Sequence, residues 1–408
     1  METRQTRIRN WRIAIISAAA LALILKIYLS LTTFGTNDVL TWQSFLNNIR
    51  QFGGIGTYQR PGIFGDPFNH PPFMIHVLKT LGNLSDLSGL PFPFWIRLPA
   101  IIADIGSLWL LSKMKTPPLM LLLFALCPAS ILISGFHGNT DPVMISFVLL
   151  SLYVIEIKGY TWVAGLAFGM ALNIKVVPLI FVPAIAFYLR EPRKIAEFFG
   201  ASVGTVFLCS LPYALLDPIL IARKTLGYGS TYNRWGWPMI LSFAFPSPLK
   251  LPFTGYNGSL LHHFLFTYFK YALLTIIIFL SWRMNRDRCA RPSLFIQVGL
   301  IVSLFLALTP GFGMQYLAWL IPFVIALGTY RTVSYYLTSG AFLFATYSLW
   351  SEGNWYYADS IKVRAPVLSI YLLSLLCWLA VVFTCAKYLR ILSIFSGSRL
   401  HKRPVLQD

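Results

Sequence analysis

The sequence predicts an all-α membrane protein with about twelve transmembrane helices. Hydrophobic residues make up 56% of the 408-residue chain and charged residues only 12%, whereas a soluble domain carries about 25% charged residues. Continuous apolar runs recur along the chain, and their length suits helices that span the bilayer core. Backbone groups in lipid must be paired within helices or closed barrels, and these runs do not alternate as strands would, so helices are predicted.

Charge and cysteine usage narrow the class further. The formal net charge is +19, and the basic residues lie in short clusters between the apolar runs. Such clusters mark the cytoplasmic ends of spans, so they indicate topology rather than nucleic-acid binding. The five cysteines show neither a disulfide framework nor the spacing of a zinc site. We therefore expect one integral-membrane domain over residues 1–408.

The N-terminal segment METRQTRIRNWR is basic and precedes the apolar run Ile13–Phe34. This run is long enough to cross a bilayer as an uncleaved helix, which we favour over a signal peptide. The basic flank places the N-terminus in the cytoplasm and the first long loop, about 35–93, outside. In that loop Val39–Gln51 and Phe73–Leu84 have apolar residues at helical spacing, which predicts short helices along the membrane interface.

Further spans are predicted at Phe94–Leu111, Pro117–Ser134, Pro142–Ile157, Phe198–Leu215, His263–Trp282, Ser293–Thr309, Thr332–Trp350 and Pro366–Ala386, with another ending at Arg331. The stretch Tyr160–Leu189 fits one long kinked helix or a hairpin of two short spans. The hairpin, with its turn at Asn173–Lys175 facing outward, puts the basic clusters after Leu189 and Trp282 inside, so we favour it. The second long outer loop, about 216–262, is also expected to carry short interfacial helices, and both termini are expected to be cytoplasmic.

Polar side chains collect at the predicted outer ends of the spans. Asp38 follows the first span, His137 and Asp141 lie in the turn GFHGNTD, Lys175 lies at the hairpin turn, and Gln315–Tyr316 follow a later span. One cavity that opens outward would gather them. Asp38 is either a carboxylate that caps a helix end or a general base that takes a proton from a hydroxyl.

Other outer residues are candidates for binding a phosphate or a sugar. Lys175 suits a phosphate, and a lysine that snorkels at a span end is the alternative. Arg234 lies in TYNRWGWP, where it suits a phosphate or sugar, or equally packs on Trp. His70 in FNHPPF and His137 are donors or bases on outer turns, although a lone histidine usually has neither role.

The second predicted span contains two ionisable residues. Arg97 and Asp104 are seven residues apart and so lie near the same helix face, two turns from each other. Ionisable groups inside a membrane are functional candidates by default, and a buried structural hydrogen bond or ion pair is the alternative. We interpret both as structural or site-supporting residues.

These features resemble the GT-C class of integral-membrane glycosyltransferases, which use polyprenyl-phosphate sugars. The matching elements are Asn37–Asp38 after the first span, the aromatic–Pro–Pro element Phe68–Phe73, the span WIRLPAIIADIGSLWLL, the turn GNTD, which is similar to that in the mannosyltransferases of glycosylphosphatidylinositol synthesis, and the late segment TPGFGMQYLAWLIP. The resemblance covers most of the chain in topology, and its motifs are short.

The resemblance implies an inverting transfer of a hexose, with mannose favoured, from a polyprenyl-phosphate-sugar donor to a lipid-linked or glycan acceptor on the non-cytoplasmic face. Asp38 would be the acceptor-side base. The donor phosphate and sugar would be bound by Lys175, Arg234, His70, His137, Asp141, Gln315 and Tyr316. Many members have two acidic residues where this chain has Asn37–Asp38, so we expect neither a metal ion nor another cofactor.

Two other functions compete with this interpretation. One is a multi-span transporter or flippase of a lipid-linked saccharide, but no paired halves with matching broken helices are visible. The other is a polymerase or ligase of surface polysaccharide, but the outer loop before the last span is short. The tail HKRPVLQD has no endoplasmic-reticulum retention signal, which favours a bacterial or archaeal plasma membrane over the endoplasmic reticulum.

Overall fold

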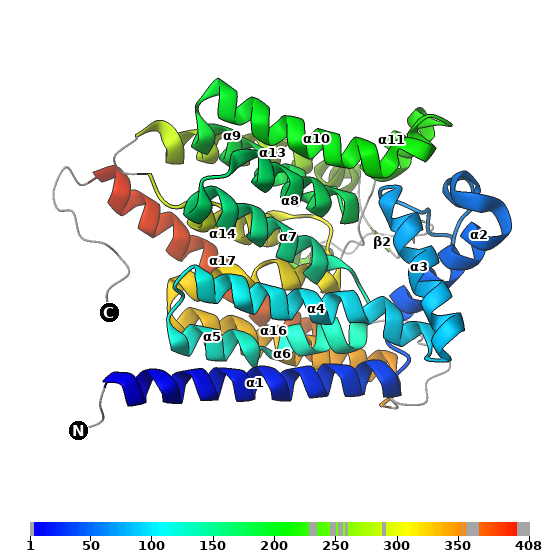
Figure 1. Ribbon diagram of the computed structural model, residues 1–408, viewed down its shortest axis with the longest axis horizontal. Helices are drawn as coiled ribbons and strands as arrows, with labels where there is room; N and C mark the ends of the chain where they lie inside the picture. Colours follow the sequence, from blue (N-terminus) through cyan, green and yellow to red (C-terminus); the bar gives the residue numbers. More distant parts are fainter. Residues whose placement is uncertain are drawn as a thin grey trace.

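The computed structural model describes residues 4–227, 235–244, 250–251, 256–257, 260–287, 291–353, 355 and 367–397. Within these residues the chain is helical, apart from a two-residue antiparallel pair of β1 (Lys250–Leu251) and β2 (Tyr256–Asn257). The predicted all-α class is therefore confirmed. The long helices run side by side along the molecule, as Figure 1 shows.

Five helical segments among the described residues are long and apolar enough to cross a membrane. They belong to α1 (Arg4–Thr32), α4 (Phe92–Lys113), the run of α5 (Pro118–Ala125), α6 (Pro128–Leu132) and η1 (Ile133–His137), α10 (Pro192–Ala214) and α17 (Leu368–Gly397). The predicted count of about twelve spans is not confirmed, because several other apolar helices have fewer than 18 residues.

The remaining helices are α7 (Asp141–Tyr153), η2 (Val154–Lys158), α8 (Thr161–Ile174), η3 (Val177–Phe181), α9 (Val182–Leu189), α12 (Gly236–Ala244), α13 (Leu260–Arg286), α14 (Leu294–Leu308), η4 (Met314–Trp319), α15 (Ile321–Val324), η5 (Ile325–Leu327) and α16 (Thr329–Trp350). Most of these helices are shorter, whereas α13 and α16 have 27 and 22 residues. The predicted span ending at Arg331 is in fact a chain of short turns, which stops at Gly328 with a φ of +87°.

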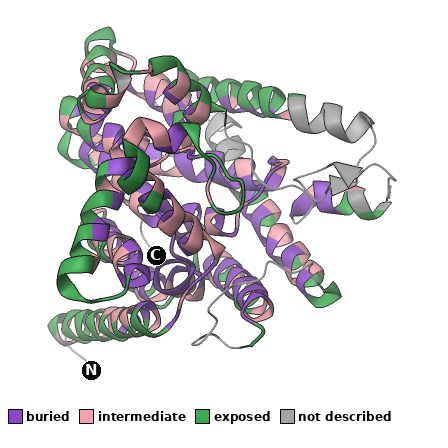
Figure 2. Cartoon of the chain, turned by 90° about the vertical axis from the view of Figure 1, so that its right-hand side faces the viewer, coloured by how far each residue is buried: buried purple, intermediate pink, exposed green. Residues whose placement is uncertain are grey.

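The helical surfaces are apolar where they face away from the core. Only 22% of the apolar window in α1 and 17% of that in α10 is buried. Large side chains such as Ile16, Ile24, Val203 and Leu208 are exposed on these two helices. Exposed apolar helices around a buried centre, visible in Figure 2, are the surface expected for contact with lipid. The chain is therefore a membrane protein.

The first predicted outer loop is largely helical. It forms α2 (Asn37–Gln59) and α3 (Phe73–Ser88), which extend the two predicted helical stretches. These helices lie with α11 (Pro218–Leu226) at one end of the molecule, opposite the start of α1 and the end of α17 (Figure 1). The chain thus places its first predicted outer segment and part of its second at the same end of the helices.

A tight link joins α1 to α2 and determines where Asp38 lies. Thr36 caps α2, and its hydroxyl accepts the backbone N–H of Asp38 at 3.3 Å. Gly35 has a φ of +104°, and a Cβ there would lie 2.0 Å from Nη2 of Arg97 and 2.7 Å from the Phe136 carbonyl oxygen. Only glycine fits this position, so the sequence Gly-Thr-Asn-Asp specifies the turn.

The stretch 160–189 is broken at Lys175, as the hairpin prediction required. Helix α8 ends at Ile174, and Lys175 has extended backbone (φ −152°, ψ 149°) before η3 begins. Gly165 of α8 contacts Phe198 of α10, and Gly169 contacts Ser202, so α8 and α10 run in the same direction. The chain between them must return through η3 and α9, which makes α8 and α9 the arms of a hairpin.

Candidate functional site

Asp38 lies in the first turn of α2, and its side chain is 26% exposed. Both of its hydrogen bonds use the same oxygen: Oδ2 accepts from Nε2 of His137 at 3.1 Å and from Nδ2 of Asn139 at 2.5 Å. Oδ1 has no partner among the described residues. One carboxylate oxygen is thus held by the protein while the other is available to a ligand.

The turn that follows η1 is joined to the start of α2. The hydroxyl of Thr36 donates to the His137 carbonyl at 2.8 Å, and the indole N–H of Trp42 donates to the Gly138 carbonyl at 3.0 Å. Gly138 has a φ of +84°, and a Cβ there would lie 2.5 Å from Val39. This close approach brings His137 and Asn139 to Asp38.

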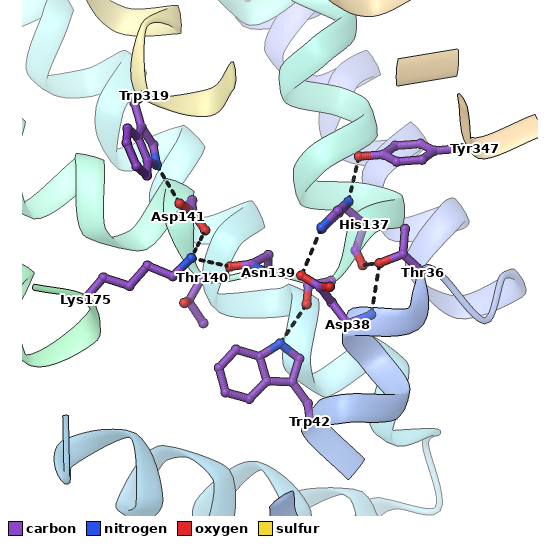
Figure 3. A network of polar contacts seen from close by, with 11 residues as sticks. Thr36, Asp38, Trp42, His137, Asn139, Thr140, Asp141, Lys175, Trp319 and Tyr347 are labelled. Atoms are coloured by element: carbon purple, nitrogen blue, oxygen red, sulfur yellow. Dashed lines mark hydrogen bonds and ion pairs between the residues drawn. The ribbon is translucent and has the colours of Figure 1, made fainter. Parts of the chain in front are cut away.

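A continuous chain of polar contacts extends in both directions from Asp38 (Figure 3). On one side, Nδ1 of His137 lies 2.7 Å from the hydroxyl of Tyr347 in α16. On the other, Oδ1 of Asn139 accepts from Nζ of Lys175 at 3.2 Å. Nζ of Lys175 also lies 2.5 Å from the fully buried Asp141, whose other oxygen accepts the indole N–H of Trp319.

Asp38 opens onto a cleft of about 440 Å³. Its walls come from the α1–α2 link, the loop before α3, the turn after η1, the α8–η3 break, α11, the segment around η4 and the end of α16. The polar and aromatic residues among them are Asn37, Asp38, Thr41, Trp42, Phe45, Asp66, Asn69, His70, His137, Asn139, Lys175, Arg223, Lys224, Thr225, Phe312, Gln315, Tyr316 and Trp350. Segments far apart in sequence therefore share one cavity.

The pKa values of the two cleft carboxyls, Asp38 and Asp66, shift in opposite directions. Burial acts to raise the pKa of Asp38, but hydrogen bonding and charge from His137, together with Asn139 and Lys175, outweigh it and leave that pKa below its ordinary value. Burial and the charge of Asp38 raise the pKa of Asp66. Asp38 is accordingly the carboxyl that stays ionised most readily.

The structure brings most of the sequence candidates to this cleft. Asp38, His70, His137, Lys175, Gln315 and Tyr316 line it, while Asp141 lies behind Lys175 as its ion-pair partner. Arg234 falls outside the described residues.

The cations available for a phosphate differ from those singled out in the sequence. Asp141 lies 2.5 Å from Lys175 and compensates its charge, and both ring nitrogens of His137 are engaged. Arg223 and Lys224, in the last turn of α11, line the cleft and have no acidic partner among the described residues. A basic pair in a predicted outer loop departs from the positive-inside pattern, and this signal could have identified them.

His70 is a buried uncharged ring. Its centroid lies 4.6 Å from that of Trp42, and Nδ1 lies 3.4 Å from the Ile174 carbonyl. Burial, reinforced by the charge of Lys175, lowers the pKa of His70 to about 3. His70 is therefore a neutral part of the cleft wall at physiological pH, which makes it a poor cationic ligand for a phosphate.

The burial of neutral His70 leads to a pH-dependent stability. Below its ordinary pKa of 6.5 the unfolded chain binds a proton on His70 that the folded chain excludes down to about 3. The contribution of neutral His70 to the unfolding free energy is thus fully present above pH 6.5. It is lost on acidification, by up to about 1.4 kcal/mol for each pH unit. We expect His70→Asn to flatten the fall in unfolding free energy between pH 6.5 and 4, measured in detergent. His76→Asn, at an exposed histidine of α3, is the control, and equal slopes for the two variants would contradict the expectation.

Arg97 and Asp104 do not bind each other; both hold α1. The Arg97 guanidinium donates to the carbonyls of Leu29, Ser30, Thr33 and Phe34 and to the Thr33 hydroxyl. Asp104 accepts from Lys26 of α1 at 2.5 Å, and from Ser130 and Ser134 at 2.8 and 2.5 Å. Their position on one face of α4 thus serves the packing of α1 and the segment after it.

Sequence reasoning did not single out Asn139, Tyr347, Arg223, Lys224 or Trp319 as site residues. Asn139 lies between His137 and Asp141 in the same turn, so its position between two candidate residues could have identified it. Tyr347 is one of 20 tyrosines, and nothing in its sequence surroundings distinguishes it. Among the described residues, no group of three or more His, Cys, Asp or Glu is placed to hold a metal ion.

Comparison with known proteins gives one family. The model of the family described as Mannosyltransferase (PIG-M) matches residues 133–240. These are GT-C-type membrane mannosyltransferases, and the matched region contains His137, Asn139, Asp141, Lys175, Arg223 and Lys224. The match confirms the resemblance seen in the sequence and identifies an enzyme that transfers sugars. No curated protein matches the chain.

Proposed function

We propose that this membrane glycosyltransferase moves a hexose, with mannose favoured, from a polyprenyl-phosphate sugar to a hydroxyl of a lipid-linked or glycan acceptor, with inversion at the anomeric carbon. The observation that carries the proposal is Oδ1 of Asp38, which has no hydrogen-bond partner in the described part of the chain, in a cleft that Arg223 and Lys224 also line. A carboxylate can accept the proton of the acceptor hydroxyl, and cations can bind the donor phosphate. One cavity therefore contains the groups that both substrates require.

Asp38 acts as the acceptor-side base. The hydroxyl proton passes to Oδ1 as the acceptor oxygen bonds to the anomeric carbon. The bond between that carbon and the phosphate oxygen breaks on the opposite face, and polyprenyl phosphate leaves with the bonding electrons. Because His137 and Asn139 already occupy Oδ2, the carboxylate is oriented before the acceptor binds.

The departing phosphate needs cationic stabilisation more than a general acid, because it leaves as an anion. Arg223 and Lys224 supply two charges without an acidic partner in the described part of the chain. Lys175 then serves mainly to hold Asn139 and Asp141. The aromatic faces of Trp42, Tyr316 and Trp350 in the same cleft suit contact with a sugar ring.

The proposed topology places the cleft on the non-cytoplasmic side of a bacterial or archaeal plasma membrane, with the endoplasmic reticulum as the alternative. The predicted count of about twelve spans includes helices too short to cross fully. Helix α8, for example, has 14 residues, or about 21 Å, which is less than the roughly 30 Å hydrocarbon core. Because α8 ends beside the cleft at Lys175, the cleft would extend below the membrane surface, where a lipid-borne phosphate can enter.

The function is tested with purified protein in detergent or vesicles and a panel of polyprenyl-phosphate sugars. We expect a glycosidic product from polyprenyl-phosphate mannose and release of polyprenyl phosphate. Movement of an intact lipid-linked saccharide across the vesicle membrane, without bond formation, would instead favour the transporter alternative. Transfer with the anomeric configuration retained would exclude the single displacement at Asp38.

Neutralising the two cleft cations should weaken donor binding. We expect the double variant Arg223→Gln/Lys224→Gln to raise the KM for the donor about 10- to 100-fold, since each hydrogen bond to a charged group contributes about 1.5–3 kcal/mol before solvent screening. The KM for the acceptor should change little. Lys79→Gln, at an exposed lysine of α3 that does not line the cleft, is the matched control. A donor KM equal to that of the control would show that Arg223 and Lys224 of α11 do not bind the donor phosphate.

A further inference from the structure

The ring of His137 is held at both nitrogens. It is 2% exposed, with Nε2 at 3.1 Å from Oδ2 of Asp38 and Nδ1 at 2.7 Å from the hydroxyl of Tyr347. Its backbone is held as well, because its carbonyl accepts the Thr36 hydroxyl at 2.8 Å. A buried ring tied down in this way has no nitrogen left for a phosphate or sugar, so its role must act through its two partners.

The partners determine which nitrogen carries the proton. Oδ2 of an ionised Asp38 can only accept, so Nε2 carries a hydrogen and donates it. In neutral imidazole Nδ1 is then an acceptor and the Tyr347 hydroxyl donates to it, whereas in the imidazolium Nδ1 carries a hydrogen and donates to that hydroxyl. All three groups are satisfied in this arrangement, with every donor opposite an acceptor. Replacing the Tyr347 hydroxyl by hydrogen would leave the buried Nδ1 without its partner and remove the contact that orients the ring.

We propose that His137 and Tyr347 form a positioning pair for Asp38, in which Tyr347 holds Nδ1 and so orients the His137 ring, and His137 holds Oδ2 so that Oδ1 receives the acceptor proton. This inference rests on the role of Asp38 as base proposed above. The pair lies on η1 and α16, on the side of Asp38 away from Lys175 (Figure 3). Asn139 makes the second bond to Oδ2 and completes the fixation.

The charges around Asp38 determine how the pair should affect the pH profile. His137, Lys175 and Asn139 lower the pKa of Asp38 against the effect of burial. The other titratable groups nearby are His70 and Asp66 in the loop before α3, while Arg97 of α4 is directed at the carbonyls that end α1. Because the hydrogen bond and any positive charge of His137 favour the ionised carboxylate, removal of the ring should raise the pKa of Asp38, and activity should then fall at a higher pH on acidification.

The test compares variants of the full-length protein in a sugar-transfer assay across pH. We expect Tyr347→Phe, which keeps the ring, to lower kcat about tenfold with the donor KM unchanged. We expect His137→Ala to lower kcat further and to move the acid limb of kcat/KM upward by about one pH unit or more. His137→Gln should recover part of the activity, because its amide can still donate to Oδ2.

Tyr336→Phe is the matched control, since Tyr336 is another buried tyrosine of α16 whose hydroxyl donates to the Ile321 carbonyl at 2.8 Å. If Tyr347→Phe and His137→Ala give the same kcat and pH profile as this control, the positioning role is wrong. Equal activities of His137→Gln and His137→Ala would also overturn it, because the retained donor would then have no effect. Full activity of Asp38→Asn would instead refute the base itself, so the two failures are distinguishable.

Discussion

Asp38→Asn is expected to lower kcat for sugar transfer by about 10²–10⁴-fold, the range that a positioned general base contributes. The substituted amide has nearly the same shape, but it lacks a carboxylate oxygen to receive the acceptor proton. The assay is transfer from polyprenyl-phosphate mannose by purified protein. Donor binding should persist, because Arg223 and Lys224 lie on the α11 side of the cleft.

The comparison variant for this result is Asp86→Asn. Asp86 lies on α3, where it pairs with Arg50 in an exposed ion pair, and it does not line the cleft. Exposed pairs contribute at most about 1 kcal/mol, so this variant should remain active. If Asp38→Asn retained the activity of Asp86→Asn, another group would have to be the base, and the orientation of Oδ1 would have no catalytic meaning.

The gathering of distant residues in one cleft was the part of the site that the sequence predicted best. The basic clusters placed Asp38, Lys175 and Gln315 on one side of the membrane, and the structure shows all three lining one cleft. The side of the membrane on which a segment lies can be predicted directly from the distribution of basic residues along the chain.

The sequence did not reveal which polar side chains of the site contact one another. Lys175 looked like a free cation, but Asp141, 34 residues earlier, compensates it. Tyr347 reaches His137 across 210 residues of sequence. Such contacts depend on how α8 and α16 pack against η1, which no local pattern encodes. The predicted count of about twelve spans is not confirmed, since several apolar helices are shorter than a full span, and helices shielded by neighbours and bordering a cleft need not be as long as the bilayer is thick.

Arg97 is where the largest effect on stability is expected. Its guanidinium is fully buried and donates to five oxygen atoms at the end of α1, in the segment from Leu29 to Phe34. These carbonyls belong to the last turn of a helix and to the link after it, so they have few other donors. The same guanidinium lies against Gly35, three residues before Asp38. Arg97 therefore connects the packing of α1 and α4 to the position of the proposed base.

Arg97→Met is expected to lower the unfolding free energy by at least about 3 kcal/mol, because each buried carbonyl left without a donor costs about 1–3 kcal/mol. Arg97→Lys should recover only part of this loss, since one ammonium cannot reproduce the planar set of donors. The measurement is thermal or denaturant unfolding in detergent, alongside sugar transfer by the fraction that remains folded. Arg50→Met, which removes an exposed guanidinium from α2, should cost less than about 1 kcal/mol. If the folded fraction of Arg97→Met transferred sugar at the rate of Arg50→Met, Arg97 would support the fold alone. A lower rate per folded molecule would show that the end of α1 determines where Asp38 meets the acceptor.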